Sequence, residues 1–199
     1  MRIVVIGATG TIGRAIVEAL EGAEHEIIRV SQKSTPITVE LADSASILAM
    51  YKLVGKADAV VCAAGSARFK PLAELTDDDF EFSLRNKLMG QVNVVRYGFD
   101  HVNDGGSFTL TSGILARDPM PGGAAVSLVN AGLEGFTRAA ASEAPRRIRV
   151  NAVSPPWVTE TLEAMGMETS LGLPAAKVAA CYVQSVTGIE NGCVLEPKA

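Results

Sequence analysis

Short apolar runs alternate with segments of helical periodicity along the whole chain. The runs are rich in Val and Ile and predict buried strands over residues 2–6, 26–30, 37–39, 57–62, 107–110, 147–152 and 193–195. Between them, apolar residues that recur every three or four positions predict helices over residues 12–20, 44–53, 82–100, 123–143 and 174–185. Elements that alternate at this spacing predict βαβ units, a parallel sheet and one domain over residues 1–199.

Three local signals refine the expected boundaries. Asp43 or Ser44 can cap the second helix, and Thr76 can cap a turn of three aspartates that favours the positive end of a helix. Gly105 and Gly106 are expected to break the chain just before the fifth strand.

The composition indicates a core of small aliphatic side chains. Hydrophobic residues make up 48% of the chain and aromatic residues only 5%, which suits a parallel sheet buried on both faces. The net charge is -4 and no basic stretch is dense, which argues against a nucleic-acid partner. The three cysteines form no C-x-x-C pair, and no secretion signal or apolar run of the roughly 18–20 residues that span a bilayer is present. We therefore expect a cytoplasmic protein with reduced thiols and no membrane contact.

A glycine-rich loop lies directly between the first predicted strand and the first predicted helix. Its glycines are Gly7, Gly10 and Gly13, in a G-x-x-G-x-x-G spacing. A pyrophosphate site needs a sharp turn, a close approach of the backbone to the phosphates and a helix packed on the sheet, and a Cβ hinders each of these. The start of the helix also offers free N–H groups to an anion. We expect this loop to bind a dinucleotide through Gly7, Thr9, Gly10, Thr11, Ile12 and Gly13.

The residues after the second strand bear on the choice between NAD and NADP. Ser31 stands where NAD-binding proteins usually carry an acidic residue that accepts hydrogen bonds from the ribose 2′-hydroxyl. Ser31 and Gln32 can instead donate to a 2′-phosphate, and Lys33 can neutralise it. We therefore favour NADP(H) over NAD(H), the alternative being that Lys33 is only a solvated turn residue.

Several short motifs follow one another in the order found in one large family. They are ELAD at 40–43, CAAG at 62–65, NKLMG at 86–90, LTS at 110–112, LEGFT at 133–137 and NAVSPP at 151–156. With the glycine loop, this series resembles the short-chain dehydrogenase/reductase family, in particular its extended and atypical branches. The resemblance implies a Rossmann fold, a doubly wound parallel sheet of about seven strands in the order 3-2-1-4-5-6-7. It also implies cofactor contacts from Glu40, Leu41, Ala63, Ala64, Gly65, Pro155 and Val158.

The catalytic residues that the family uses are only half present. The resemblance places the catalytic Ser at Ser112 and the catalytic Asn at Asn86. Aligned on the LEGFT motif, the catalytic Tyr falls at Val126 and the Lys four residues later at Asn130. Val126 has no proton to give, and neutral Asn130 cannot lower the pKa of a phenol, although it could hydrogen-bond a ribose hydroxyl. No Tyr or Lys occurs between Arg117 and Glu143, so no shift of the alignment restores the pair.

Two functions therefore compete. The first is an NADP(H)-dependent oxidoreductase of unusual mechanism, which passes hydride to a small molecule such as a quinone or flavin that needs no concerted protonation. The second is an inactive dinucleotide-binding sensor or regulatory subunit. No metal site is expected, because His25 and His101 lie on separate elements, and a hydrolase triad is excluded because no histidine follows Ser112.

Two further expectations follow from the family pattern. Only about a dozen residues separate Glu160 from Pro174, where the family usually places a helical lid over the substrate. This spacing predicts an open site. The helix over residues 123–143 is rich in Ala, Gly and Val on more than one face, which favours a homodimer or homotetramer, unless those small residues only let the helix approach the sheet.

Overall fold

Seven parallel strands form one sheet. The computed structural model describes residues 1–23 and 25–198. Its strands are β1 (Arg2–Ile6), β2 (Glu26–Ser31), β3 (Ile37–Thr38), β4 (Ala57–Cys62), β5 (Val102–Thr111), β6 (Arg149–Val153) and β7 (Val194–Leu195). Their order in the sheet is β3-β2-β1-β4-β5-β6-β7, and every pairing is parallel. The predicted Rossmann sheet and its strand order are therefore confirmed.

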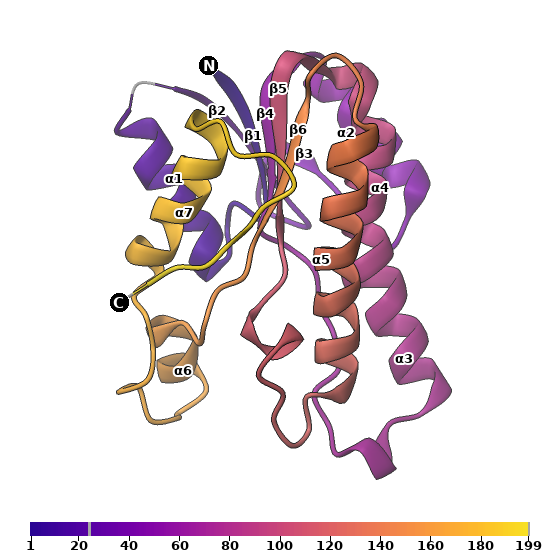
Figure 1. Ribbon diagram of the computed structural model, residues 1–199, viewed down its shortest axis with the longest axis vertical. Helices are drawn as coiled ribbons and strands as arrows, with labels where there is room; N and C mark the ends of the chain where they lie inside the picture. The colour runs from indigo at the N-terminus through magenta and orange to yellow at the C-terminus, as the bar shows by residue number, and fades with distance from the viewer. Residues whose placement is uncertain (24, 199) are drawn as a thin grey trace.

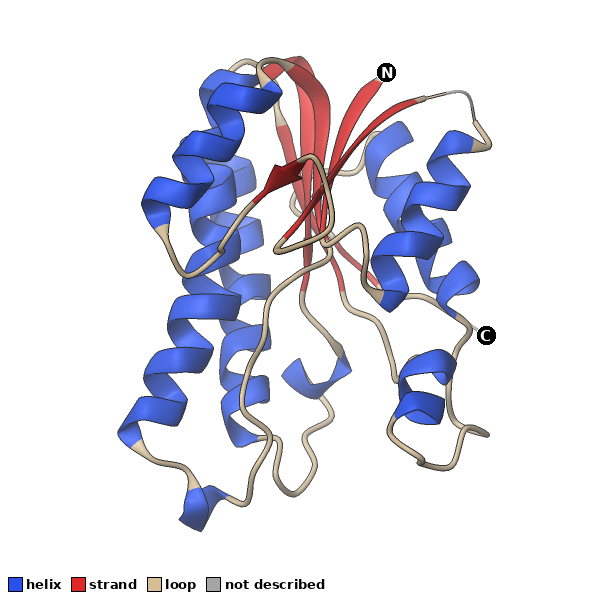
Figure 2. Ribbon diagram, turned by 180° about the vertical axis from the view of Figure 1, so that it is seen from behind, coloured by secondary structure: helices blue, strands red, loops and turns tan. Residues whose placement is uncertain are grey.

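Helices cover both faces of the sheet and make three layers (Figure 1). One face carries α1 (Thr11–Glu21) and α7 (Ala175–Thr187), which pack side by side. The other face carries α2 (Ser44–Val54), α4 (Met89–Gly98) and α5 (Ala124–Glu143), and Figure 2 shows the same layers from behind. The short helix α6 (Thr159–Ala164) lies beyond the carboxyl ends of the strands. Among the described residues, no helix is both long and apolar enough to cross a bilayer.

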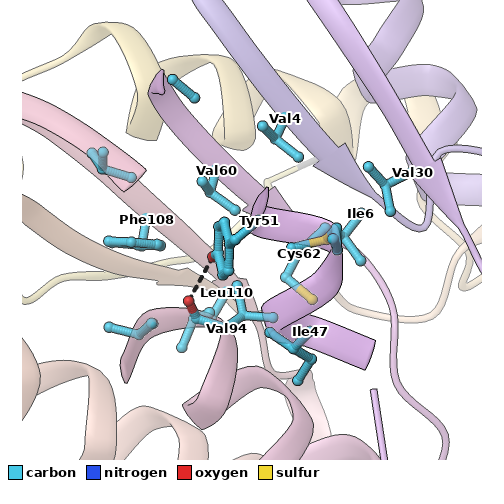
Figure 3. Packing of buried hydrophobic residues seen from close by; sticks show 14 of the residues in the cluster. Val4, Ile6, Val30, Ile47, Tyr51, Val60, Cys62, Val94, Phe108 and Leu110 are labelled. Carbon is cyan, nitrogen blue, oxygen red and sulfur yellow. Dashed lines mark hydrogen bonds between the residues drawn. The ribbon is translucent and has the colours of Figure 1, made fainter. Parts of the chain in front are cut away.

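The two cores follow from the alternation of side chains along buried strands. On β1, Val4 and Ile6 point into the core under α2, α4 and α5, whereas Ile3 and Val5 point into the core under α1 and α7. All four side chains are fully buried. Tyr51 of α2 is buried in the first core, and its hydroxyl donates a hydrogen bond of 2.6 Å to the carbonyl oxygen of Val94 (Figure 3). This bond ties α2 to α4 across the core.

Two local details differ from the expectation drawn from the sequence, one inside β5 and one after β6. The expected break at Gly105 and Gly106 lies inside β5, where the pairing with β4 shifts between Ala57 and Ala59. A Cβ on Gly106 would lie 2.5 Å from the carbonyl oxygen of Asp58, so the glycine permits close packing rather than ending the strand. The short helix α6 was not predicted.

The helix expected over residues 82–100 is longer and irregular. It begins as α3 (Asp77–Ser83), and Thr76 caps it as predicted, in a reciprocal capping box with Asp79. A π-helical turn, Leu84–Leu88, then joins α3 to α4. Such a turn inserts an extra residue, so side chains after Ser83 face directions that a regular 3.6-residue period does not give.

Candidate functional site

The glycine loop joins the end of β1 to the start of α1. Gly7 has a φ of +88°, and a Cβ there would lie 2.6 Å from the carbonyl oxygen of Ala63. A Cβ on Gly13 would lie 2.0 Å from the carbonyl oxygen of Gly7, so the first turn of α1 packs directly on the loop. Gly10 is exposed, and the nearest atom to its Cβ position is 3.4 Å away. The first and last glycines are therefore needed for the fold, whereas the middle one leaves space for a ligand.

The amino terminus of α1 is open to an anion. Its N-cap is Gly10, which supplies no side chain to bond the free N–H groups of the first turn. Thr11 is the first residue of the helix and is exposed. The backbone carbonyl oxygen of Thr9 accepts a 2.8 Å hydrogen bond from Nε of Arg14, which fixes the position of Thr9. This arrangement suits a phosphate.

Two hollows of similar size lie on either side of this loop. The glycine-loop hollow, about 310 Å³, is lined mostly by residues expected to bind the cofactor: Gly7, Thr9, Gly10, Ser31, Gln32, Glu40, Leu41, Ala63, Ala64 and Gly65. Val39, Ser66 and the expected catalytic residue Asn86 line it as well. The Ser112 hollow, about 300 Å³, contains Ile12, Ala63, Ala64, Gly65, Lys87, Ser112, Val126, Asn130, Pro155, Trp157 and Val158 in its lining. Residues 63–65 line both, so the two hollows meet along the end of β4.

Glu40 organises the far end of the glycine-loop hollow. Its carboxylate accepts a 2.6 Å bond from Nε2 of Gln32 and a 3.1 Å bond from the backbone N–H of Ala42. Asn86 lies at the same hollow, where its Oδ1 accepts a 2.7 Å bond from the backbone N–H of Ser66. The structure therefore brings Asn86 together with Glu40 rather than with Ser112.

The three residues expected to select the cofactor differ in what they can offer. Ser31 is buried, and its hydroxyl is bonded to the carbonyl of Lys33 and to Oγ1 of Thr35. Lys33 and Gln32 line a wide hollow of about 840 Å³ next to the loop, which Arg14 also lines. Arg29 lines it too but is paired with Glu21, so Lys33 and Arg14 are the cations that a 2′-phosphate could reach, and Ser31 shapes the turn.

Ser112 follows the carboxyl end of β5 and lines the same hollow as Val126 and Asn130, the positions expected to replace the family's Tyr and Lys. Its hydroxyl donates a 3.1 Å bond to Oε1 of Glu134, and only 2% of the residue is exposed. Asn130 donates from Nδ2 to the carbonyl of Gly113 at 3.3 Å. Its buried Oδ1 accepts no hydrogen bond from any described residue, so this atom is available to a ligand hydroxyl. Val126 adds only apolar surface.

One charged side chain in the Ser112 hollow, Lys87, was not predicted from the sequence. Lys87 comes from the π-helical turn, and its Nζ donates a 3.2 Å bond to the carbonyl oxygen of Ser112. Burial lowers the pKa of Lys87 from its usual value to about 8. The available signal was its place next to Asn86 in the NKLMG stretch, but the helical period did not show which of the two would face Ser112.

Comparison with known proteins defines the class. A family model described as enoyl-(acyl carrier protein) reductase matches residues 18–186. The protein lin1944 from Listeria innocua, whose crystal structure is known, is 42% identical over 100% of both chains, with a TM-score of 0.95. The chain belongs to the short-chain dehydrogenase/reductase family.

Other relatives are more distant. Hydroxynaphthalene reductase arp2 of Aspergillus fumigatus is 31% identical over 154 residues, which cover 76% of this chain and 55% of that enzyme. The chain thus spans about half the length of the fungal reductases it matches. A small-chain dehydrogenase crystallised in complex with NADPH is 24% identical, covers 98% of this chain and 95% of its own, and has a TM-score of 0.87. At that identity, the likeness concerns the fold.

Proposed function

We propose that this protein is an NADP(H)-dependent oxidoreductase that passes hydride between the nicotinamide and a small-molecule acceptor. The observation that carries the proposal is the pair of hollows that meet at residues 63–65 beside the glycine loop. A dinucleotide has two nucleotide halves joined by a pyrophosphate, and the loop lies where that pyrophosphate would bind.

The residues present fit such a cofactor. The start of α1 offers N–H groups to the pyrophosphate, and Gly10 leaves the space that a close approach requires. In the Ser112 hollow, Oδ1 of Asn130 is a buried acceptor that lacks a donor among the described residues, as a site for a ribose hydroxyl would require. When bound, the nicotinamide would supply or accept the hydride, and this chain would bind, orient and shield it.

The preference for NADP rests on charge. Arg14, Arg29 and Lys33 line the same hollow beside the loop. Arg29 is paired with Glu21, so a phosphate on the adenosine ribose would find Arg14 and Lys33. The carboxylate of Glu40 is held by Gln32 and the backbone N–H of Ala42, so it is not free to take the role of an NAD-selecting acid.

The acceptor is proposed to be a quinone or a flavin. By the alignment on the LEGFT motif, the positions of the family's Tyr and Lys are expected to be Val126 and Asn130, and neither side chain can give a proton to a substrate oxygen. A quinone or flavin can take a hydride first and a proton in a later step, so its reduction does not require a proton donor at these two positions. The six-residue helix α6 also leaves the Ser112 hollow open to a flat, bulky molecule.

The single tryptophan of the chain provides a direct test. Trp157 lines the Ser112 hollow, so NADPH bound as proposed should quench its fluorescence and receive its energy as nicotinamide emission. A Trp157→Phe variant should still bind NADPH and enhance its fluorescence when the nicotinamide is excited directly. It should show no nicotinamide emission when the protein is excited, because the tryptophan donor is gone. We expect NADPH to bind in the micromolar range and NADH more weakly. No binding of either nucleotide would remove the oxidoreductase proposal.

A regulatory, non-enzymatic role is the second candidate, and the replacement of Tyr and Lys by Val126 and Asn130 favours it. It predicts tight NADPH binding with no turnover of quinones or flavins. Measurable NADPH oxidation by wild-type protein with such acceptors would argue for the enzyme instead.

The proposed homo-oligomer would use the face formed by α4 and α5. These helices lie side by side, and a groove between them is lined by Val95, Phe99 and Phe136. Leu128 of α5 is 48% exposed on the described chain. Light scattering after gel filtration tests this: Phe136→Glu should convert an oligomer to a monomer, whereas a monomeric wild-type protein would contradict the proposal.

A further inference from the structure

We propose that Lys87 is the residue that exchanges a proton with the substrate oxygen in the Ser112 hollow, a role for which this chain has neither the family's Tyr nor its Lys. This inference rests on the proposed oxidoreductase function. It assigns to one side chain the chemistry that Val126 and Asn130 cannot perform.

The position of Lys87 supports the assignment. Its Nζ lies 3.2 Å from the carbonyl oxygen of Ser112, and the side chain lines the same hollow as Val126 and Asn130. An ammonium has three N–H donors, and the bond to Ser112 uses one of them. Among the described residues that line the hollow, Lys87 is the only one with a basic side chain.

Two backbone features hold Lys87 in this place. The π-helical turn Leu84–Leu88 carries it, and Gly65 packs against it from the end of β4. A Cβ on Gly65 would lie 3.1 Å from Cα and 3.2 Å from Cγ of Lys87, and Gly65 has a φ of +128°. Because Gly65 has no side chain, the aliphatic part of Lys87 can pack against residues 63–65, which form the floor that the two hollows share.

The surroundings let Lys87 titrate near neutral pH. Burial lowers its pKa to about 8, close to the value at which a general acid or base works well at cellular pH. Of the titratable side chains described, Cys62 of β4 interacts electrostatically with Lys87. Burial raises the pKa of Cys62 to about 12, so it stays an uncharged thiol. The carboxylates near the two hollows are bonded to other groups: Glu134 of α5 accepts a hydrogen bond from the Ser112 hydroxyl, and Glu40 accepts hydrogen bonds from Gln32 and Ala42.

In the proposed step, NADPH would reduce a quinone or other carbonyl compound. The acceptor gains a hydride at one end of its π system, the C=O π electrons move onto oxygen, and that oxygen takes a proton from Nζ of Lys87. The acceptor would leave reduced by two electrons, with its oxygen as a hydroxyl and NADP+ as the other product, and the neutral amine of Lys87 would regain a proton from water. The reverse steps describe oxidation.

The competing explanation is that Lys87 only tethers its helix to β5 through the Ser112 carbonyl. A tether would matter for stability, whereas a proton donor would matter for rate and its pH dependence. Burying a charged ammonium is unfavourable, so Lys87→Met should leave the melting temperature unchanged or raise it. Between pH 8 and 10.5 the unfolded lysine is protonated while the folded one is not, so wild-type stability should rise with pH there, and the variant should lose this rise.

The experiment compares wild type with Lys87→Met, Lys87→Arg and the control Lys52→Met, which removes a charge from the exposed face of α2. NADPH affinity is measured by fluorescence, NADPH oxidation is measured with 9,10-phenanthrenequinone from pH 6 to 10, and the pKa of the lysine Nζ groups is measured by NMR. In wild type we expect turnover that falls about tenfold per pH unit above the pKa of about 8, and one lysine that titrates there. Lys87→Met should lower turnover by about 100-fold or more with a similar NADPH affinity, because the acceptor oxygen that gains negative charge from the hydride would have no ammonium beside it, even where the proton follows in a later step. Lys87→Arg should be slow and lack the pH limb, because a guanidinium does not titrate in this range.

The outcomes separate the two proposals. If wild type fails to bind NADPH, the proposed function is wrong and the inference falls with it. If wild type turns over and Lys87→Met matches it, the function stands and the role of Lys87 is refuted. Binding without wild-type turnover would also refute the role of Lys87 and favour the sensor. A melting temperature lowered only in Lys87→Met, with normal turnover, would identify a tether.

Discussion

Gly10 and Gly13 of the loop should respond differently to the same added methyl group, and Gly10→Ala is the informative case. Gly10 has φ -78° and ψ 171°, a conformation open to alanine, and its Cβ would meet nothing nearer than 3.4 Å. The free energy of unfolding should therefore change by less than about 1 kcal/mol, since the weaker N-cap is offset by a less flexible unfolded chain. In a protein of this size that is a shift of about 2–4 °C in melting temperature.

The effect on binding should be much larger. The methyl group would occupy the space through which a phosphate approaches the N–H groups at the start of α1. Loss of one hydrogen bond to a charged group removes about 1.5–3 kcal/mol. We therefore expect Gly10→Ala to raise the Kd for NADPH by about 10- to 100-fold. Energy transfer from Trp157 and calorimetry would measure this independently.

Two other glycines complete the comparison. Gly13→Ala places a Cβ 2.0 Å from the Gly7 carbonyl oxygen, so it should lower the free energy of unfolding by about 1–3 kcal/mol as well as weaken binding. Gly135 lies exposed on α5 with no atom within 4 Å of its Cβ position, so Gly135→Ala should stabilise the helix by about 1 kcal/mol and leave binding unchanged. If Gly10→Ala binds NADPH like wild type, the loop is not the pyrophosphate site and the reasoning fails.

Three further substitutions test other parts of the structure. Lys33→Glu should raise the Kd for NADPH at least tenfold with little change for NADH, and equal changes for both nucleotides would contradict the proposed contact with the 2′-phosphate. Ser112→Ala leaves the buried carboxylate of Glu134 without this donor, so it should lower the free energy of unfolding by about 1–3 kcal/mol in urea titrations; undiminished turnover would remove Ser112 from the catalytic site. Tyr51→Phe should lower the free energy of unfolding in urea titrations by about 0.5–1.5 kcal/mol, because the hydrogen bond to the Val94 carbonyl is lost, and it should not change the NADPH affinity.

The fold and the loop could be predicted because their causes are local in the sequence. A β-branched run followed by Gly7 and Gly13 leaves few alternatives to a strand, a tight turn and a helix packed on it. The alternation of strands and helices then determines a parallel sheet with right-handed crossovers, and only one strand order matches the family.

The chemistry of the Ser112 hollow depended on contacts that are distant in sequence. The partner of Ser112 is Glu134, 22 residues away, and nothing in the LTS stretch indicates it. Asn86 and Lys87 are neighbours in the chain, yet Asn86 faces Glu40 and Lys87 faces Ser112. The π-helical turn sets that division, and an apolar period of 3.6 residues carries no sign of it.

The floor shared by the two hollows has a kinetic consequence. Residues 63–65 line both, so a dinucleotide that spans them would itself become one wall of the space left for the acceptor. An acceptor that arrived first would sit in the path of the nicotinamide ring and would meet only part of its binding surface. We therefore expect a compulsory order, in which the nucleotide enters first and leaves last. NADP+ should accordingly inhibit competitively against NADPH and non-competitively against the acceptor.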